Sequence, residues 1–85
     1  MIDDNQAKRN IAANLARLLE AREWTQSALA RMIDEDQPRI SQLLRAQHMP
    51  GAGLLARIAE AFDVSVDRLL GTPPEENSVD SRKSA

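Results

Sequence analysis

The chain is 85 residues long, of which 42% are apolar and 28% charged, and its formal net charge is −2. This length holds one domain around one small core, and the composition is that of a folded protein. With no cysteine and one histidine, disulfides, thiol nucleophiles and Cys/His zinc sites are excluded. No apolar run reaches the roughly 18 to 20 residues that span a membrane, and the acidic first residues are no secretory signal. We therefore expect a cytoplasmic protein.

The charge is unevenly distributed along the chain. Residues 8–47 contain seven Lys or Arg and five Asp or Glu, whereas residues 48–85 contain four and six. The N-terminal half is therefore mildly basic. If the partner is a polyanion, non-specific attraction is weak and specific contacts must supply more of the affinity.

Residues 5–22 are predicted to form the first helix, for which Asp4 or Asn5 is suited to be the cap. Apolar side chains recur on one side of it with helical period: Ile11, Leu15, Leu18 and Leu19. After a break at Glu23 and Trp24, Thr25 is the expected N-cap of a second helix, about 26–32. We expect Trp24 to pack in the core.

The acidic triplet 34–36 ends the second helix and leads into a third, about 37–46. Pro38 is tolerated in its first turn, where backbone N–H groups lack partners. Because Pro38 disfavours helical geometry at Gln37, either Asp36 or Gln37 is the cap. The triplet has no further ligands near it in the sequence, so capping and solvation explain it better than a cation site does.

Two more helices are predicted before the chain changes character. Residues 48–51 form a loop by composition, and residues 52–62 carry apolar side chains at helical period. Ser65 is the expected cap of a short fifth helix, about 66–70, which Gly71 ends. Beyond it the sequence is rich in Pro, Ser and charge, so we predict a folded domain over 1–71 and a flexible tail over 72–85. The expected fold class is all-α.

The second and third helices are short, amphipathic and joined by about four residues. Two helices so closely linked cross at a steep angle, which is the helix-turn-helix geometry. The outer side of the later helix is then free to enter a DNA major groove. Because no nucleophile, base or metal ligands converge in the pattern, we expect no enzyme activity, no cofactor and no metal.

The run Trp24-Thr25-Gln26-Ser27-Ala28-Leu29-Ala30, followed by Ile40-Ser41 and by Arg45 before Pro50, resembles the phage-repressor/Cro (XRE) type of helix-turn-helix protein. The closing run 55–70, LARIAEAFDVSVDRLL, is similar to the same family. The resemblance covers about residues 8–71. It implies a compact five-helix, lambda-repressor-like DNA-binding domain with the helix-turn-helix at helices 2 and 3.

Four positions depart from the family pattern, and all lie at the ends of these two helices. Asp34 and Ala46 stand where the family usually has Gly, Glu35 replaces a small apolar residue, and Leu44 replaces a Glu. The departures concern the geometry of the turns rather than the main faces of the helices.

Stepping about 100° per residue from the buried position of Ile40 shows which side chains of the third helix point outward. Gln can bind adenine and Arg guanine through paired hydrogen bonds, and Pro can contact a thymine methyl group. Together with the resemblance, this predicts base contacts from Gln37, Pro38, Arg39 and Gln42. The expected phosphate contacts, of which Gln26 is implied by the resemblance, are Gln26, Ser27, Ser41, Arg45 and Arg9. The alternative is that these are ordinary solvated side chains.

One recognition helix covers only a few base pairs, so such proteins normally pair on two half-sites about 34 Å apart. We therefore expect a homodimer on a pseudo-palindromic operator in double-stranded DNA. The expected interface consists of Leu54, Val64, Val66 and Leu69, unless these side chains all pack inside the single chain.

The main hypothesis is a transcriptional repressor of the compact phage or prophage type. One alternative is an antitoxin that binds both DNA and a toxin, for which residues 72–85 are the only spare segment. Another is a module that uses this fold for protein contact alone. A protein antirepressor or a toxin is the further partner that these hypotheses allow.

Overall fold

The computed structural model describes residues 3–73, which form five helices and no strand. The helices are α1 (Asp4–Arg22), α2 (Gln26–Met32), α3 (Gln37–Leu44), α4 (Ala52–Phe62) and α5 (Val66–Leu70). The all-α prediction is confirmed, and α2, α4 and α5 have the predicted bounds. Apart from positions 72 and 73, the predicted tail lies outside the described residues. Within the described part, no helix is long and apolar enough to cross a membrane.

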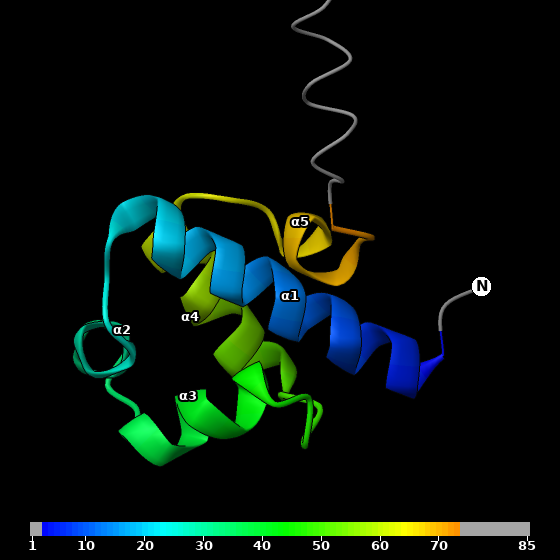
Figure 1. Cartoon of the computed structure of the whole chain (residues 1–85), viewed down its shortest axis with the longest axis horizontal. Helices are drawn as coiled ribbons and strands as arrows, with labels where there is room; N and C mark the ends of the chain where they lie inside the picture. Colours follow the sequence, from blue (N-terminus) through cyan, green and yellow to red (C-terminus); the bar gives the residue numbers. More distant parts are fainter. Residues whose placement is uncertain (1–2, 74–85) are drawn as a thin grey trace, which may run out of the picture.

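The longest helix, α1, runs through the middle of the molecule (Figure 1). In this view α5 lies on one side of α1 and α3 on the other, and both contact it. In turn α2 packs against α3, and α4 packs against α5. The core between the helices is almost entirely aliphatic, and it consists of Ile11, Leu15, Leu18, Leu19, Leu29, Ala30, Ile33, Ile40, Leu43, Leu54, Leu55, Ile58, Ala59, Phe62 and Leu69.

Trp24 packs against the core at the end of α1, as predicted. Its ring stacks on Phe62 with centroids 4.9 Å apart and planes inclined by 27°. The guanidinium of Arg22 lies 5.3 Å from the centre of the Trp24 ring and donates a hydrogen bond of 2.7 Å to the Phe62 carbonyl. This cluster joins the C-terminal ends of α1 and α4.

Local capping signals fix the N-terminal ends of three helices. Thr25 and Ser65 are the N-caps of α2 and α5, as predicted, and their hydroxyls accept from backbone N–H groups at 3.0 and 3.1 Å. The N-cap of α1 is Asp3, whose carboxylate accepts from the Gln6 N–H at 2.8 Å. The prediction of Asp4 or Asn5 was wrong by one residue or two, because three neighbouring residues are all good caps.

Two buried asparagines of α1, to which the sequence analysis gave no role, hold α5 in place. The Asn14 side-chain nitrogen donates to the carbonyls of Leu69 and Gly71, both at 2.8 Å, and Asn10 donates to that of Leu70 at 2.9 Å. A helix of five residues leaves most of its last carbonyls without intrahelical partners. The α1 amides supply those partners, so α5 is fixed to α1 by polar bonds as well as by the packing of Leu69.

Replacing Asn14 by alanine should destabilise the fold far more than the same change at Asn5. Asn14 is fully buried and serves two carbonyls, whereas Asn5 is exposed in the first turn of α1. Leaving buried acceptors unpaired costs about 1 to 3 kcal/mol each, so we expect Asn14→Ala to lower the free energy of unfolding by about 2 to 4 kcal/mol. Chemical denaturation followed by Trp24 fluorescence measures this. Equal losses in Asn14→Ala and Asn5→Ala would contradict the assignment.

Candidate nucleic-acid interface

The turn between α2 and α3 is closed by backbone hydrogen bonds. The N–H of Glu35 donates to the Ala30 carbonyl at 2.8 Å, and the N–H of Asp34 donates to that of Arg31 at 3.3 Å. These are the two bonds of a Schellman motif, in which the first residue after the helix cap has a left-handed conformation. Asp34 takes that conformation with φ 57°, at the position where glycine would be expected.

After the turn, α3 begins at Gln37 with Asp36 as its N-cap. Asp36 is extended and makes no side-chain capping bond, while its carbonyl accepts from the N–H groups of Arg39 and Ile40 at 3.0 and 3.4 Å. Pro38 sits in the first turn, where it takes no hydrogen bond away from the helix. Of the two caps that the sequence left open, Asp36 is therefore the one observed.

The orientation of α3 separates an apolar side from a polar one. Ile40 and Leu43 are buried, with exposed fractions of 0% and 1%, and they attach α3 to the core. Gln37, Pro38 and Arg39 are exposed, and Gln42 is half-buried. All four predicted base-contact residues line one open hollow of about 510 Å³ on the outer side of the helix, which they share with Glu35 and Asp36.

A hydrogen bond between the first residues of the two helices organises this polar side. Gln37 Nε2 donates to Gln26 Oε1 at 2.7 Å. The second Nε2 hydrogen and the Oε1 atom of Gln37 have no protein partner among the described residues, so the amide retains one donor and one acceptor. That is the pair of groups with which a glutamine binds adenine in the major groove. The sequence predicted a role for each residue but gave no sign of this bond.

The predicted phosphate-contact residues are spread over three elements. Gln26 and Ser27 open α2, Ser41 lies half-buried on α3, and Arg45 is the exposed C-cap of α3. The prediction that this helix continues to residue 46 is corrected here, since it ends at Leu44. Arg9 is on α1, where its guanidinium donates to Gln6 Oε1 at 3.1 Å.

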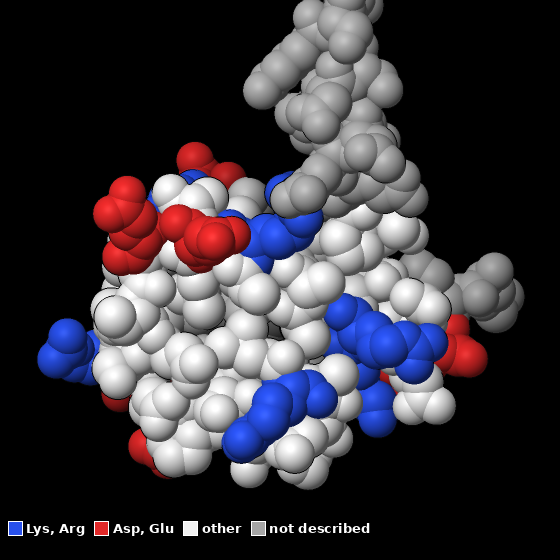
Figure 2. All heavy atoms as spheres, viewed as in Figure 1, with Lys and Arg blue, Asp and Glu red and all other residues white. Residues whose placement is uncertain are grey.

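Positive charge does not form one continuous patch on the face drawn in Figure 2. Lys and Arg side chains form several separate groups there, and Asp and Glu side chains lie at more than one edge of the same face. Next to α3, Asp34 and Asp36 are exposed, and the Glu35 carboxylate lies 3.3 Å from the guanidinium of Arg57. The weak non-specific attraction expected from the charge balance stays a prediction.

The residues predicted to form a dimer interface fall into two classes. Leu54 and Leu69 are 5% and 0% exposed and belong to the core of the single chain. Their side chains offer no free surface to a second chain, because the apolar pattern that selected them serves the chain's own core. Val64 and Val66 are half-buried against that core and keep part of their surface free.

A model of the helix-turn-helix family HTH_3 matches residues 15–69. Among solved structures, a hypothetical transcription factor from Neisseria is 23% identical, with a TM-score of 0.78 over 93% of this chain and 91% of that one. An HTH_3 family transcriptional regulator from Vibrio cholerae is 24% identical, with a TM-score of 0.73 over 79% of this chain and 38% of that one. A transcriptional regulator from Listeria innocua is 22% identical, with a TM-score of 0.67 over 87% and 72%. No curated protein matches the chain.

Replacing Ala46 by glycine should stabilise the protein. Ala46 ends α3 in the left-handed region with φ 57°, which is costly for a residue with a Cβ atom. Glycine removes this cost but loses more conformational entropy on folding than alanine does. The balance of the two effects should raise the free energy of unfolding of Ala46→Gly by about 0.5 to 1 kcal/mol. The same change at Ala16, exposed inside α1, should lower it by about 1 kcal/mol. Thermal unfolding of both variants tests this, and a shift of the same sign in both would refute it.

Proposed function

We propose, from the fact that this chain belongs to the helix-turn-helix family HTH_3 of DNA-binding transcriptional regulators, that it represses transcription by occupying an operator as a homodimer. The observation that carries the proposal is the division of α3 into two sides. Ile40 and Leu43 hold the helix in the core, while Gln37, Arg39 and Gln42 face outward around one open hollow. Membership of this family makes the protein a regulator rather than an enzyme.

In the proposed complex, α3 lies in the major groove with Gln37 nearest the bases. The Gln37 amide is restrained by the hydrogen bond that it donates to Gln26, so that less side-chain freedom is lost on binding adenine. Gln42 and Arg39 contact neighbouring base pairs, with adenine and guanine as their preferred partners. Pro38 has no donor of its own and contacts a thymine methyl group.

Phosphate contacts fix the position of α3 in the groove without specifying the sequence. Gln26 and Ser27 stand at the N-terminus of α2, where free backbone N–H groups and the helix dipole favour a phosphate. Arg45, beyond the other end of α3, and Ser41 contact the backbone on the far side of the groove. Arg9 contributes from α1 if it is released from Gln6.

The proposed dimer places two copies of α3 on half-sites about one helical turn apart. Val64 and Val66, which flank the start of α5, are the part of the predicted interface that retains free apolar surface. A repressor of this size acts by occupying its site in the cytoplasm and excluding polymerase. The antitoxin alternative depends on residues 72–85, of which only 72 and 73 are described.

Alanine at Arg39 and Gln42 together should remove operator preference. Each paired hydrogen bond to a base contributes about 1 to 3 kcal/mol, so we expect the double variant to bind the preferred duplex about 30- to 25,000-fold more weakly. Binding to a scrambled duplex should change little. Fluorescence anisotropy with DNA flanking the protein's own gene measures both affinities and the number of chains per duplex, with Arg17→Ala on α1 as the charge control. Equal, weak binding of wild type and double variant to both duplexes would exclude the proposal.

Alanine at Arg45 should instead weaken binding to all duplexes by a similar factor. A phosphate contact releases one counterion on binding, so its loss lowers the slope of log K against log salt by about 1. The slope is measured by repeating the anisotropy titrations at several salt concentrations. If Arg45→Ala changes the preference among duplexes while the slope is kept, Arg45 contacts a base instead.

A further inference from the structure

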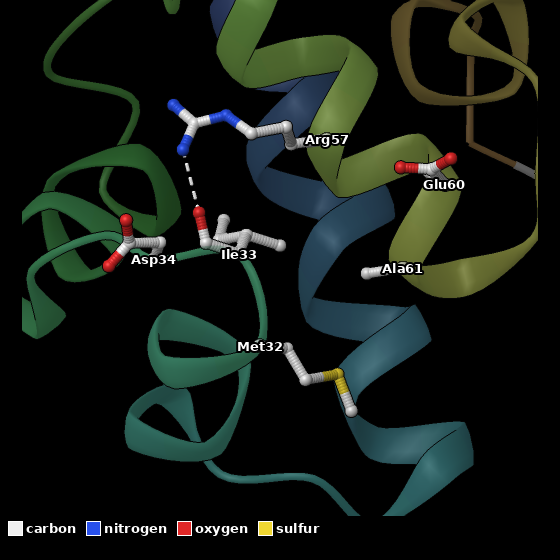
Figure 3. A pocket seen from close by; sticks show the side chains of 6 residues that line it. All are labelled: Met32, Ile33, Asp34, Arg57, Glu60 and Ala61. Carbon is white, nitrogen blue, oxygen red and sulfur yellow. Dashed lines mark hydrogen bonds between the residues drawn. The ribbon is translucent and has the colours of Figure 1, made fainter.

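Arg57 of α4 reaches across to the turn between α2 and α3, where Figure 3 shows its hydrogen bond to Ile33. Its Nη1 atom donates to the Ile33 carbonyl at 2.6 Å, and its Nη2 atom lies 3.3 Å from Glu35 Oε2. Met32, Asp34, Glu60 and Ala61 surround these groups and, with Ile33 and Arg57, line an open pocket of about 380 Å³. One planar guanidinium thus bridges two positions of the same turn, two residues apart.

The carbonyl that Arg57 contacts has no partner within the turn itself. The Schellman motif uses the carbonyls of Ala30 and Arg31, and the Ile33 carbonyl, at the C-cap of α2, is left over. The C-terminal end of a helix carries partial negative charge, which favours a cation there. The guanidinium therefore completes the set of hydrogen bonds that closes the corner.

Glu35 extends this link to Asp36, the residue that precedes α3. Its carboxylate pairs with Arg57 through Oε2, while Oε1 accepts from the N–H of Asp36 at 3.4 Å. The Glu35 side chain is 21% exposed, so the group is partly shielded from water. Because Asp36 is the N-cap of α3, a continuous series of polar contacts runs from α4 to the start of α3.

The backbone of α4 makes its main contacts with α5, and those of α2 and α3 are with each other and with α1. Side chains of α4 such as Leu55 and Ile58 meet Ile40 of α3 in the shared apolar core, and this packing is not directional. The end of α4 also leads into Val64 and Val66, the residues that we place at the dimer interface. The Arg57 contacts are thus directional polar bonds between this turn and the helix that leads to that interface.

We propose that Arg57 is a positioning residue for DNA recognition, which sets the orientation of α3 by fixing the turn before it. The proposal rests on the function proposed above, in which α3 enters the major groove. Arg57 itself contacts no base in this scheme. Its effect is on how well the two recognition helices of a dimer match the groove, and hence on operator preference more than on general affinity for DNA.

The test compares Arg57→Met, which retains an apolar stem but no donors, with Arg17→Met as the charge-matched control. Arg17 lies on α1 and has no hydrogen bond or ion pair among the described residues. The probes are the duplex that wild type enriches from a random-sequence pool and a scrambled version of it. We expect Arg57→Met to bind the enriched duplex about 10-fold or more weakly, as for the loss of a charge-assisted hydrogen bond, and the scrambled duplex no more weakly than Arg17→Met does.

Two further variants separate the contacts of the guanidinium. Arg57→Lys keeps the charge and a donor that can reach one partner at a time, so it should restore part of the preference. Glu35→Gln leaves the bond to the Ile33 carbonyl intact and removes only a partly exposed ion pair, which contributes little by itself. It should therefore weaken binding to the enriched duplex less than Arg57→Met does.

Amide hydrogen exchange tests the positioning role without DNA. In Arg57→Met, the N–H groups of Asp34 and Glu35 should exchange faster, while those of α1 and α5 keep their wild-type rates. Equal acceleration throughout the protein, or equal loss of affinity for both duplexes, would show a general stabilising role and overturn the proposal. If wild type enriches no duplex, the proposed function fails, and the exchange rates alone then decide whether Arg57 fixes the turn.

Discussion

The carbonyl ends of three helices are each held by a side chain from another helix. Arg57 donates to the end of α2, Arg22 to the end of α4, and Asn14 to the end of α5. These helices have 5 to 11 residues, a length at which an isolated helix is not stable in water. Their last carbonyls need partners, and a donor from a second helix satisfies them while fixing how the two helices lie. The aliphatic core supplies most of the stabilisation, and these directional bonds fix how the short helices lie on it.

The recognition helix differs from its neighbours in this respect. Among the described residues no side chain of another helix caps the end of α3, and the backbone bonds around Ala46 close it instead. Ile40 and Leu43 attach one side of α3 to the core, and the hydrogen bond that Gln37 donates to Gln26 restrains its start. The remaining polar groups on the outer side are uncommitted. A surface that must form new hydrogen bonds with a partner benefits from having none to break first.

Local signals in the sequence were sufficient for the bounds of α2, α4 and α5 and for the faces of α3. Thr25 and Ser65 cap their helices by accepting hydrogen bonds from N–H groups three positions later in the chain. The helical period shows which side of α3 faces the core together with Ile40. The end of α3 was placed two residues too late because Ala46, an excellent helix former, adopts a left-handed conformation that usually favours glycine. Alanine itself gives no sign of a helix end, and the glycine that the family usually has at this position was the one indication.

Contacts between distant residues could not be predicted in the same way. Asn10 and Leu70 are 60 positions apart, and Arg57 and Ile33 are 24 apart, so no spacing rule connects them. The apolar pattern likewise identifies side chains that leave water but not what covers them, which is why Leu54 and Leu69 were assigned to a dimer interface and are buried in the single chain. Which donor meets a helix end, and which leucine lies in the core, depends on how the helices pack. No local pattern in the sequence gives that packing.

The acidic turn before α3 gives the charge distribution a structural meaning. Arg57 compensates Glu35, whereas Asp34 and Asp36 stay exposed beside the start of the recognition helix. On DNA, uncompensated carboxylates at this corner would oppose a close phosphate and leave the hydrogen bonds of Gln37 and its neighbours to determine where the helix settles. A protein with a net charge of −2 gains little from non-specific attraction. In the function that we propose, its selectivity for one site over the bulk of the DNA rests on the geometry of α3, and so on the turn that Arg57 contacts.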